Sequence, residues 1–292
     1  YARQVPERLT PRDKESKHMQ TPRLLASAFT VAGNAVPLDE KTISPHSLEE
    51  RAQAAAQAGY VGIGLSNDDL EHLVDKHGYA EIKQIIADAG LQYLEFEVLL
   101  DWFADGERRA LSDIERRKFL NAAEKLDACN IKVSGDIMGT TWPLDHMIAS
   151  FAELSRQAGE AGTQVSIEVY PESNIRDLPT ALAIAQGAGS PHGGLLLDIW
   201  HINRGNIDYS EIAAMPREYL KHVELDDAGP LEGSIMEDTL NRRRLPGEGD
   251  FDIAGFLRAV AATGYDGVYG VEILSETQRQ LFPAEAAQRS FD

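Results

Sequence analysis

The regular alternation of short apolar runs with longer helical stretches constrains the fold of this chain more than any other feature. A parallel strand reaches its neighbour only through a crossover connection, and a helix is the usual crossover. The alternation therefore predicts parallel strands that are joined by helices. Eight runs have the β-branched or apolar character of strands: Leu24–Phe29, Tyr60–Leu65, Leu91–Leu99, Ile131–Ile137, Val165–Tyr170, Gly194–Ile199, Tyr219–Leu225 and Val268–Leu274.

Helix boundaries between these runs are marked by capping residues. Ser47 with Glu50, and Ser112 with Glu115, have the spacing of a capping box, which predicts a helix start at each serine. Glycine accepts the left-handed conformation that ends many helices, and a strand follows each of four glycines within a few residues. These predicted helix ends are Gly59, Gly90, Gly162 and Gly264.

The length of 292 residues is compatible with two domains or with one large barrel. No break in composition divides the eight units, and no Gly-x-Gly-x-x-Gly turn follows the first predicted strand. We therefore expect an α/β fold with a single (β/α)8 barrel. Residues 1–20 have almost no apolar periodicity and are predicted to be a leader or disordered tail, so the barrel domain is assigned to residues 21–292.

Composition excludes several classes of partner. The net charge is −19, from 28 basic and 47 acidic residues, so the surface would repel nucleic acid. The longest stretch without a formal charge, Leu178–Leu197, is interrupted by prolines and glycines and is not expected to span a membrane. The single cysteine, Cys129, cannot form a disulfide within the chain, which favours the reducing cytoplasm.

Acidic residues recur on the inward face of the last four predicted strands. Side chains alternate along a strand, and the aliphatic residues of each run are expected to face the outer helices. The remaining positions therefore point into the barrel, and each of the four strands places an acid there near its carboxyl end. These acids are Glu168, Asp198, Glu224 and Glu272.

Such a cluster is unfavourable unless positive charge compensates it. Two carboxylates ~4 Å apart repel by about 4 kcal/mol at an effective dielectric constant of ~20. No inward cation lies on these four strands, because Lys221 faces outward, and the inward Lys132 of the fourth strand is expected to lie too deep to reach a substrate. A divalent cation is therefore the simplest explanation, with a buried cluster of protonated acids and ion pairs as the alternative.

Oxygen ligands from these four acids favour Mn²⁺ or Mg²⁺. His222 lies on the same face as Glu224, two residues before it, and is the alternative ligand from the seventh strand. With His222 in its place, Co²⁺ or Zn²⁺ would become more plausible.

Five motifs resemble segments of the xylose isomerase-like superfamily of sugar isomerases and epimerases, with hydroxypyruvate isomerase-like features. They follow in order along the second half of the chain, and the resemblance extends over residues 22–276. At the position of Glu224, epimerases of this group commonly carry His and hydroxypyruvate isomerases carry Gln, so the usual substrate does not transfer. The motifs are 167–171 with 174–179, 198–203, 222–227, 246–252 and 270–273.

The resemblance implies a metal-dependent isomerase or epimerase of a small ketose or related keto sugar, acting through an enediolate. Glu168 and Glu272 would remove and return protons beside the metal. His201 would donate to a substrate oxygen, or alternatively cap or pack the strand end. Further contacts to the substrate are expected from Trp200, Tyr170 and Arg244, although the two aromatic residues are also typical core residues and the arginine belongs to a basic run.

Other functions remain open at this point. The same scaffold resembles lyases and dehydratases that act on keto sugars, keto-inositols and 3-keto-glycosides, including C-glycoside deglycosidases. DNA-repair endonucleases share the barrel, but they use a histidine-rich site on a basic face. A metal-binding protein without catalysis is the least favoured reading. Homo-oligomers are common among similar barrels, and a small carbohydrate is the expected partner.

Overall fold

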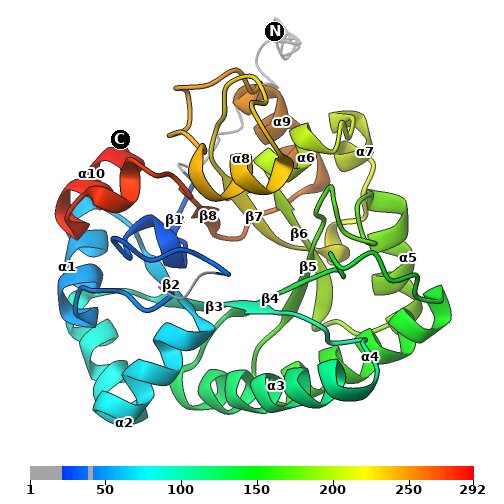
Figure 1. Ribbon diagram of the computed structural model, residues 1–292, viewed down its shortest axis with the longest axis horizontal. Coiled ribbons are helices and arrows are strands. Elements are labelled where there is room, and N and C mark those ends of the chain that lie inside the picture. The colour runs from blue at the N-terminus through cyan, green and yellow to red at the C-terminus, as the bar shows by residue number, and fades with distance from the viewer. Residues whose placement is uncertain (1–21, 39–41) are drawn as a thin grey trace, which may run out of the picture.

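The computed structural model describes residues 22–38 and 42–292, so the predicted leader at residues 1–20 lies outside the described residues. Within this part of the chain, parallel strands close into a barrel in sequence order (Figure 1). The predicted α/β barrel is therefore confirmed. The strands are β1 (Leu24–Ala26), β2 (Gly62–Ser66), β3 (Tyr93–Leu99), β4 (Asn130–Ser134), β5 (Val165–Glu168), β6 (Gly193–Asp198), β7 (Leu220–Leu225) and β8 (Tyr269–Val271).

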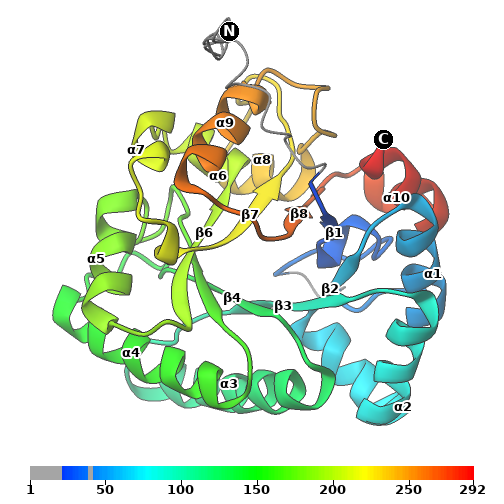
Figure 2. The same ribbon diagram turned by 180° about the vertical axis from the view of Figure 1, so that it is seen from behind.

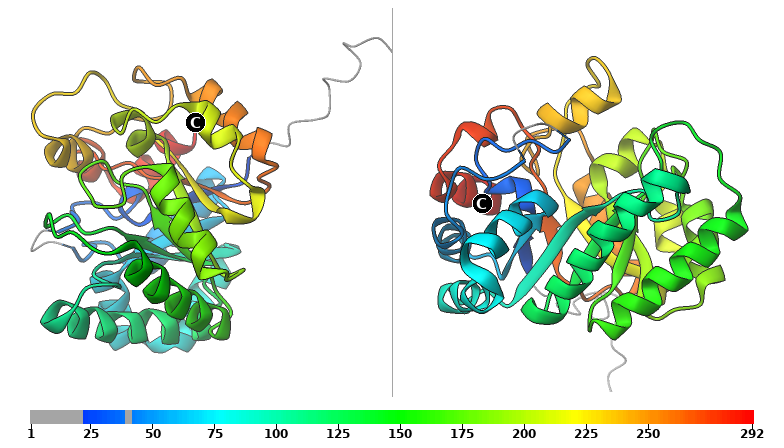
Figure 3. Two further views of the ribbon diagram at one scale, coloured as in Figure 1. Left: turned by 90° about the vertical axis from the view of Figure 1, so that its right-hand side faces the viewer. Right: turned by 60° about the horizontal axis from the view of Figure 1, so that its bottom comes forward.

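Helices surround the barrel, as the views from behind and from two further directions show (Figures 2 and 3). The helix α8 projects beyond this ring (Figure 3). No helix of residues 22–38 or 42–292 combines the length and apolar character that a membrane span requires. The helices are α1 (Leu48–Ala58), α2 (Asn67–Ala89), α3 (Gly106–Leu126), α4 (Leu144–Glu160), α5 (Leu178–Ala188), α6 (Ile199–Arg204), α7 (Tyr209–Ala213), α8 (Ile235–Asn241), α9 (Ile253–Thr263) and α10 (Pro283–Phe291), with short 3-10 turns η2 (Ala28–Thr30), η3 (Arg217–Tyr219) and η4 (Gln278–Gln280).

One predicted helix start is confirmed and the other is wrong. Ser47 caps α1, and its side chain accepts a hydrogen bond from the backbone N–H of Glu50 at 3.2 Å. Ser112 lies inside α3, which begins six residues earlier, and its hydroxyl donates to the carbonyl of Leu100 at 2.6 Å. The capping spacing was fortuitous there, because the serine anchors the helix to the preceding loop instead of starting it.

Strand register explains how the acids gather. Asp198 of β6 lies opposite Glu224 of β7, which in turn lies opposite Gly270 of β8. All strands run in the same direction, so their carboxyl ends meet at one end of the barrel. Outward residues such as Ile167 and Leu197 are fully buried in the apolar core against the helices. The alternation therefore leaves the polar residues of these strands for the interior.

Candidate metal centre and active site

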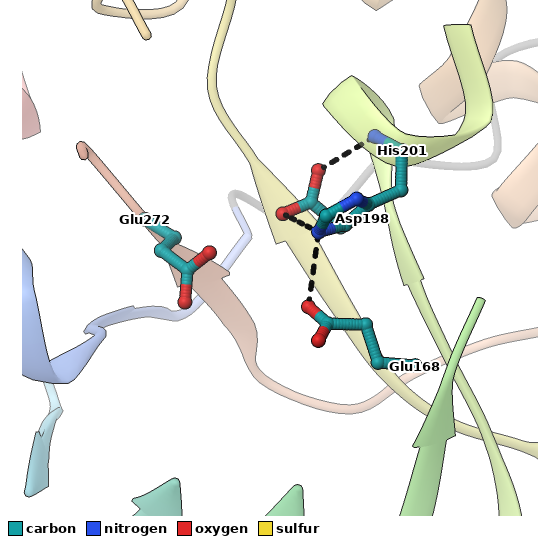
Figure 4. A group of neighbouring side chains, drawn as sticks. All are labelled: Glu168, Asp198, His201 and Glu272. Carbon is teal, nitrogen blue, oxygen red and sulfur yellow. Dashed lines mark hydrogen bonds and ion pairs between the residues drawn. The ribbon is translucent and has the colours of Figure 1, made fainter. Parts of the chain in front are cut away.

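Three of the four predicted acids meet at the carboxyl ends of their strands. Glu168 and Asp198 are the last residues of β5 and β6, and Glu272 directly follows β8. Together with His201 of α6, each offers one ligand atom, and these atoms lie within 4.8 Å of one another. In Figure 4, Glu272 faces the other three side chains from the opposite side of the group.

Local structure fixes the position of Asp198. It is the N-cap residue of α6, and its Oδ1 accepts hydrogen bonds from the backbone N–H groups of Trp200 at 2.6 Å and His201 at 3.3 Å. A carboxylate at this position also interacts favourably with the positive end of the helix dipole. The strand-to-helix turn therefore holds the acid in place and leaves Oδ2 directed toward the cluster.

The imidazole of His201 links two of the acids. Its Nε2 lies 3.1 Å from Glu168 Oε1 and 3.8 Å from Asp198 Oδ2 (Figure 4). The ring packs edge-on against Tyr170, with the ring centres 5.2 Å apart. His201 is thus held in the cluster, where its imidazole can exchange a proton with a group in the pocket.

A cavity of about 180 Å³ opens above this cluster. Its floor includes Glu168, His201 and Glu272. It also includes Glu97 of β3, which the sequence analysis did not single out. The alternation that revealed acids on the last four strands is also present in β3, where Glu95 and Glu97 share the inward face, so the same signal could have found them.

Two cations lie among these acids, and one of them was not predicted. Arg243, in the segment between α8 and α9, is almost fully buried. Its Nη1 lies 2.6 Å from Oδ2 of both Asp198 and Asp226, and 2.9 Å from Glu272 Oε2. Strand alternation does not reveal this arginine, because it enters the barrel from a loop.

Lys132, which was expected to lie too deep to reach a substrate, is almost fully buried but extends to the acids at the strand ends. Its Nζ lies 3.1 Å from Glu272 Oε1, and the residue lines the cavity. The same ammonium group also contacts three acids of β3 and β7, at 3.4 Å from Glu95 Oε1, 2.9 Å from Glu97 Oε2 and 2.5 Å from Glu224 Oε1. The long side chain spans the interior, which strand position alone does not reveal.

These charges shift the pKa values of the buried groups in opposite directions. Burial would raise the pKa of Glu272, but Lys132 and Arg243 hold it well below its ordinary value. Burial raises the pKa of Glu224 well above its ordinary value, and repulsion from Glu272 adds to this. Burial lowers the pKa of Lys132, but the surrounding carboxylates outweigh it and raise the pKa well above the ordinary value. Glu272 is therefore held as a carboxylate beside permanently charged partners.

The predicted ligand from β7 does not join the cluster. Glu224 and the alternative ligand His222 instead lie with Glu95 in a second buried group. Glu224 Oε1 accepts a hydrogen bond from Ser27 at 2.6 Å and contacts Lys132. Both candidates for the seventh strand therefore sit apart from the three acids at the strand ends.

The predicted substrate contacts differ in their placement. Tyr170 and His201 line the cavity. Trp200 is fully buried behind the cavity lining, where its ring packs against His201 with ring centres 5.1 Å apart and its indole N–H donates to Asp238 at 3.1 Å. The guanidinium of Arg244 donates to the carbonyl of Glu248 at 3.1 Å, and its neighbour Arg243 lines the cavity instead.

The donor set fits a divalent cation. Three carboxylates and one imidazole each place a ligand atom within 4.8 Å of the others, close to the ~4.2 Å that separates opposite ligands of a metal with bonds of ~2.1 Å. A cation held there would share Asp198 and Glu272 with the guanidinium of Arg243. The three carboxylates of this cluster outnumber the two cations, Arg243 and Lys132, that contact its members, which favours an added positive charge.

Curated relatives of this chain are enzymes. The chain is 27% identical over 234 residues to a 3-dehydroshikimate dehydratase of Pseudomonas aeruginosa, an alignment that covers 79% of this chain and 36% of that protein. It is 26% identical over 140 residues to an inosose isomerase of Bacillus subtilis, which covers 47% of this chain and 49% of that protein. This chain therefore spans about a third of the length of the dehydratase.

Solved structures share the fold. A xylose isomerase-like TIM barrel/4-hydroxyphenylpyruvate dioxygenase fusion protein superposes with a TM-score of 0.81 at 20% identity, covering 93% of this chain and 42% of that chain. The IOLI protein with a bound zinc atom has a TM-score of 0.79 at 18% identity, covering 92% of this chain and 95% of that chain. The family model described as xylose isomerase-like TIM barrel matches residues 52–292, and the chain belongs to this family.

Proposed function

We propose that this chain is a divalent-metal-dependent enzyme that moves a proton next to the carbonyl group of a small polyhydroxylated ketone, with elimination of water as the outcome. The observation that carries the proposal is the pair Glu168 and Glu272, which face each other across the cavity floor beside Asp198 and His201. Dehydration is favoured over isomerisation because the dehydratase relative aligns with 79% of this chain and the isomerase relative with 47%.

The two glutamates suit different tasks. Glu272 is held by Lys132 and Arg243, whose charges keep its pKa low and make it a weak base. Glu168 instead contacts the imidazole of His201, at 3.1 Å, and no lysine or arginine of the described residues forms an ion pair with it. We therefore assign proton removal to Glu168 and electrostatic support to Glu272.

Elimination also needs an acid at the leaving group. As Glu168 takes the proton beside the carbonyl, the carbon–hydrogen electron pair forms a double bond and the carbon–oxygen bond to the β-hydroxyl breaks. His201 is placed to give that hydroxyl a proton, so that water leaves. The carboxylates of Glu168, Asp198 and Glu272 would hold the cation, which leaves the imidazole of His201 for proton transfer. When bound, such a cation acidifies the proton beside a carbonyl by withdrawing charge.

Isomerisation or epimerisation is the second candidate. Acids from β5 and β8 approach the cavity from opposite sides, which allows a proton to leave one face of a substrate and return to the other. In that case Glu272 returns the proton that Glu168 removes. The two outcomes differ in product mass, because isomers keep the mass of the substrate and elimination releases water.

A panel of ketones with solvent deuterium tests the proposal. The metal-loaded protein is incubated in D₂O with 3-dehydroshikimate, keto-inositols, ketohexoses and 3-keto-glucosides, and products are read by mass spectrometry and NMR. We expect deuterium exchange or loss of water with at least one compound. Glu168→Gln should reduce the rate by about 10²–10⁴-fold, as expected for the loss of a general base.

Glu285→Gln is the matched control, because it makes the same chemical change at an exposed position of α10. It should keep the wild-type rate. Full activity of Glu168→Gln would refute the assignment of the base. Absence of exchange across the whole panel, in protein shown to contain metal, would refute the reaction class.

A further inference from the structure

Two small apolar clusters, separate from the main core, form the wall of the cavity. One contains Phe29 of η2 and Leu274, which follows β8. The other contains Tyr170, with Ile137 and Met236 packed against it. All five residues line the cavity. They come from the segments after β1, β4, β5 and β8 and from α8, so the wall is built from several independent parts of the chain.

The wall and the floor have different chemistry. The floor carries the carboxylates and the imidazole, whereas Ile137, Met236 and Leu274 offer no strong hydrogen-bond donor or acceptor. Hydroxyl groups of a substrate gain nothing from such side chains, because a buried hydroxyl without a partner is costly. The floor therefore suits a polyhydroxylated group, and the wall suits an apolar one.

The cations that line the cavity are already neutralised. Arg243 contacts three carboxylates within 2.9 Å, and Lys132 contacts four within 3.4 Å. Among the described lining residues, no further lysine or arginine is present to bind a phosphate or carboxylate. Neither lysine nor arginine is therefore free to pair with an anionic group of a substrate, in a chain whose net charge is −19.

We propose that the apolar wall is a subsite for an aryl or alkyl substituent, and that the substrate is an uncharged keto sugar or keto-cyclitol that carries such a group. The inference rests on the proposed function for the reaction at the floor, and it adds the class of substrate. Met236 is the side chain that we expect to contact the substituent, since α8 holds it at the cavity, where it remains partly exposed.

Binding of unreactive ligands tests the subsite without any turnover. Phenyl β-D-glucopyranoside and methyl β-D-glucopyranoside share the sugar and differ in the substituent, and isothermal titration calorimetry gives both affinities. We expect wild-type protein to bind the phenyl compound at least about tenfold more tightly, because its ring removes more apolar surface from water. Met236→Gln should reduce that preference at least fivefold.

Met138→Gln is the matched control, because Met138 is 74% exposed and lies next to Ile137 without lining the cavity. It should keep the wild-type preference. Equal binding of the two glucosides by wild-type protein would overturn the proposal, and so would an unchanged preference in Met236→Gln. Tighter binding of 3-dehydroshikimate than of phenyl glucoside would overturn the expectation of an uncharged substrate.

A second measurement separates this inference from the proposed function. The 3-keto forms of the two glucosides are compared by kcat/KM for deuterium exchange or elimination. A phenyl preference in binding without exchange of either keto compound would support the subsite and count against the proposed reaction. Exchange of both keto compounds at equal kcat/KM would support the reaction and overturn the subsite.

Discussion

The ammonium group of Lys132 is one positive charge shared by four buried carboxylates. Replacing it with methionine keeps most of the volume and leaves those acids without their common partner. Removing one member of a buried ion network typically costs about 3–5 kcal/mol. We therefore expect Lys132→Met to lower the free energy of unfolding by about that amount at pH 7, measured by urea denaturation.

Lys125→Met provides the comparison for this prediction, because Lys125 is exposed on α3 and contacts Glu124 at 3.5 Å. Its effect should stay below about 0.5 kcal/mol, as is usual for a surface residue. Equal free energies of unfolding for the two variants would show that Lys132 does not stabilise the fold by pairing with the buried acids.

At the scale of single residues, the sequence predicts which side chains point into the barrel, because this follows directly from strand alternation. Glu168, Asp198 and Glu272 were placed together because each ends or follows a strand. The direction of a long side chain is not encoded in that alternation. Glu224 therefore turns toward Lys132 and Ser27, a contact that depends on distant parts of the chain.

The loop after β4 is held by one buried carboxylate. Asp136 accepts hydrogen bonds from the backbone N–H of Met138 at 2.6 Å, the indole of Trp142 at 2.7 Å and Arg108 at 3.1 Å. Burial tends to raise the pKa of Asp136, but these donors outweigh it and hold the pKa below its ordinary value. A lowered pKa means that the ionised form stabilises the fold at neutral pH.

We expect Asp136→Asn to reduce the free energy of unfolding by about 1–2 kcal/mol at pH 7, since the hydrogen bonds to a charged acceptor are weakened. The stabilisation of the fold by the ionised Asp136 carboxylate is fully present above the ordinary pKa of the group, and it is lost as pH falls through the lowered pKa. The difference between variant and wild type should therefore shrink below about pH 4. Urea titrations at several pH values measure it, with Asp75→Asn on the exposed face of α2 as the control. A difference that stays constant with pH would contradict the role of the charge.

The sequence predicted the ends of helices well where a local residue type sets them, and poorly where contacts with distant parts of the chain set them. Gly59, Gly90 and Gly264 all end helices with positive φ angles of 116°, 83° and 85°, which glycine tolerates. The start of α3 was misplaced because Ser112 bonds to the preceding loop. The helix α8 was not predicted as a separate element, and it supplies part of the cavity wall.

For the molecule as a whole, bound metal should act as a stabilising ligand. A ligand present at about 100 times its dissociation constant stabilises the native state by about 2.7 kcal/mol. For a domain of this size that corresponds to a rise in Tm of about 5 °C or more. We expect protein stripped with a chelator to show this rise when Mn²⁺ is added in differential scanning fluorimetry.

Asp198→Asn should lose most of that rise, because Asp198 is held at the cluster by the start of α6. Glu285→Gln should keep it. If none of Mn²⁺, Mg²⁺, Co²⁺ and Zn²⁺ raises the Tm of the wild-type protein, the cluster is not a metal centre, and Arg243 and Lys132 are its permanent counter-ions.

The acids that we propose to move protons and the apolar wall are encoded in separate stretches of the chain. Glu168 ends and Glu272 follows a strand that the register of the barrel fixes, whereas Ile137 and Met236 belong to a loop and a short helix outside the barrel strands. Mutations in the wall can therefore leave the proposed proton chemistry unchanged. A gene library that randomises only Ile137 and Met236 should yield descendants that accept new compounds through an unchanged reaction.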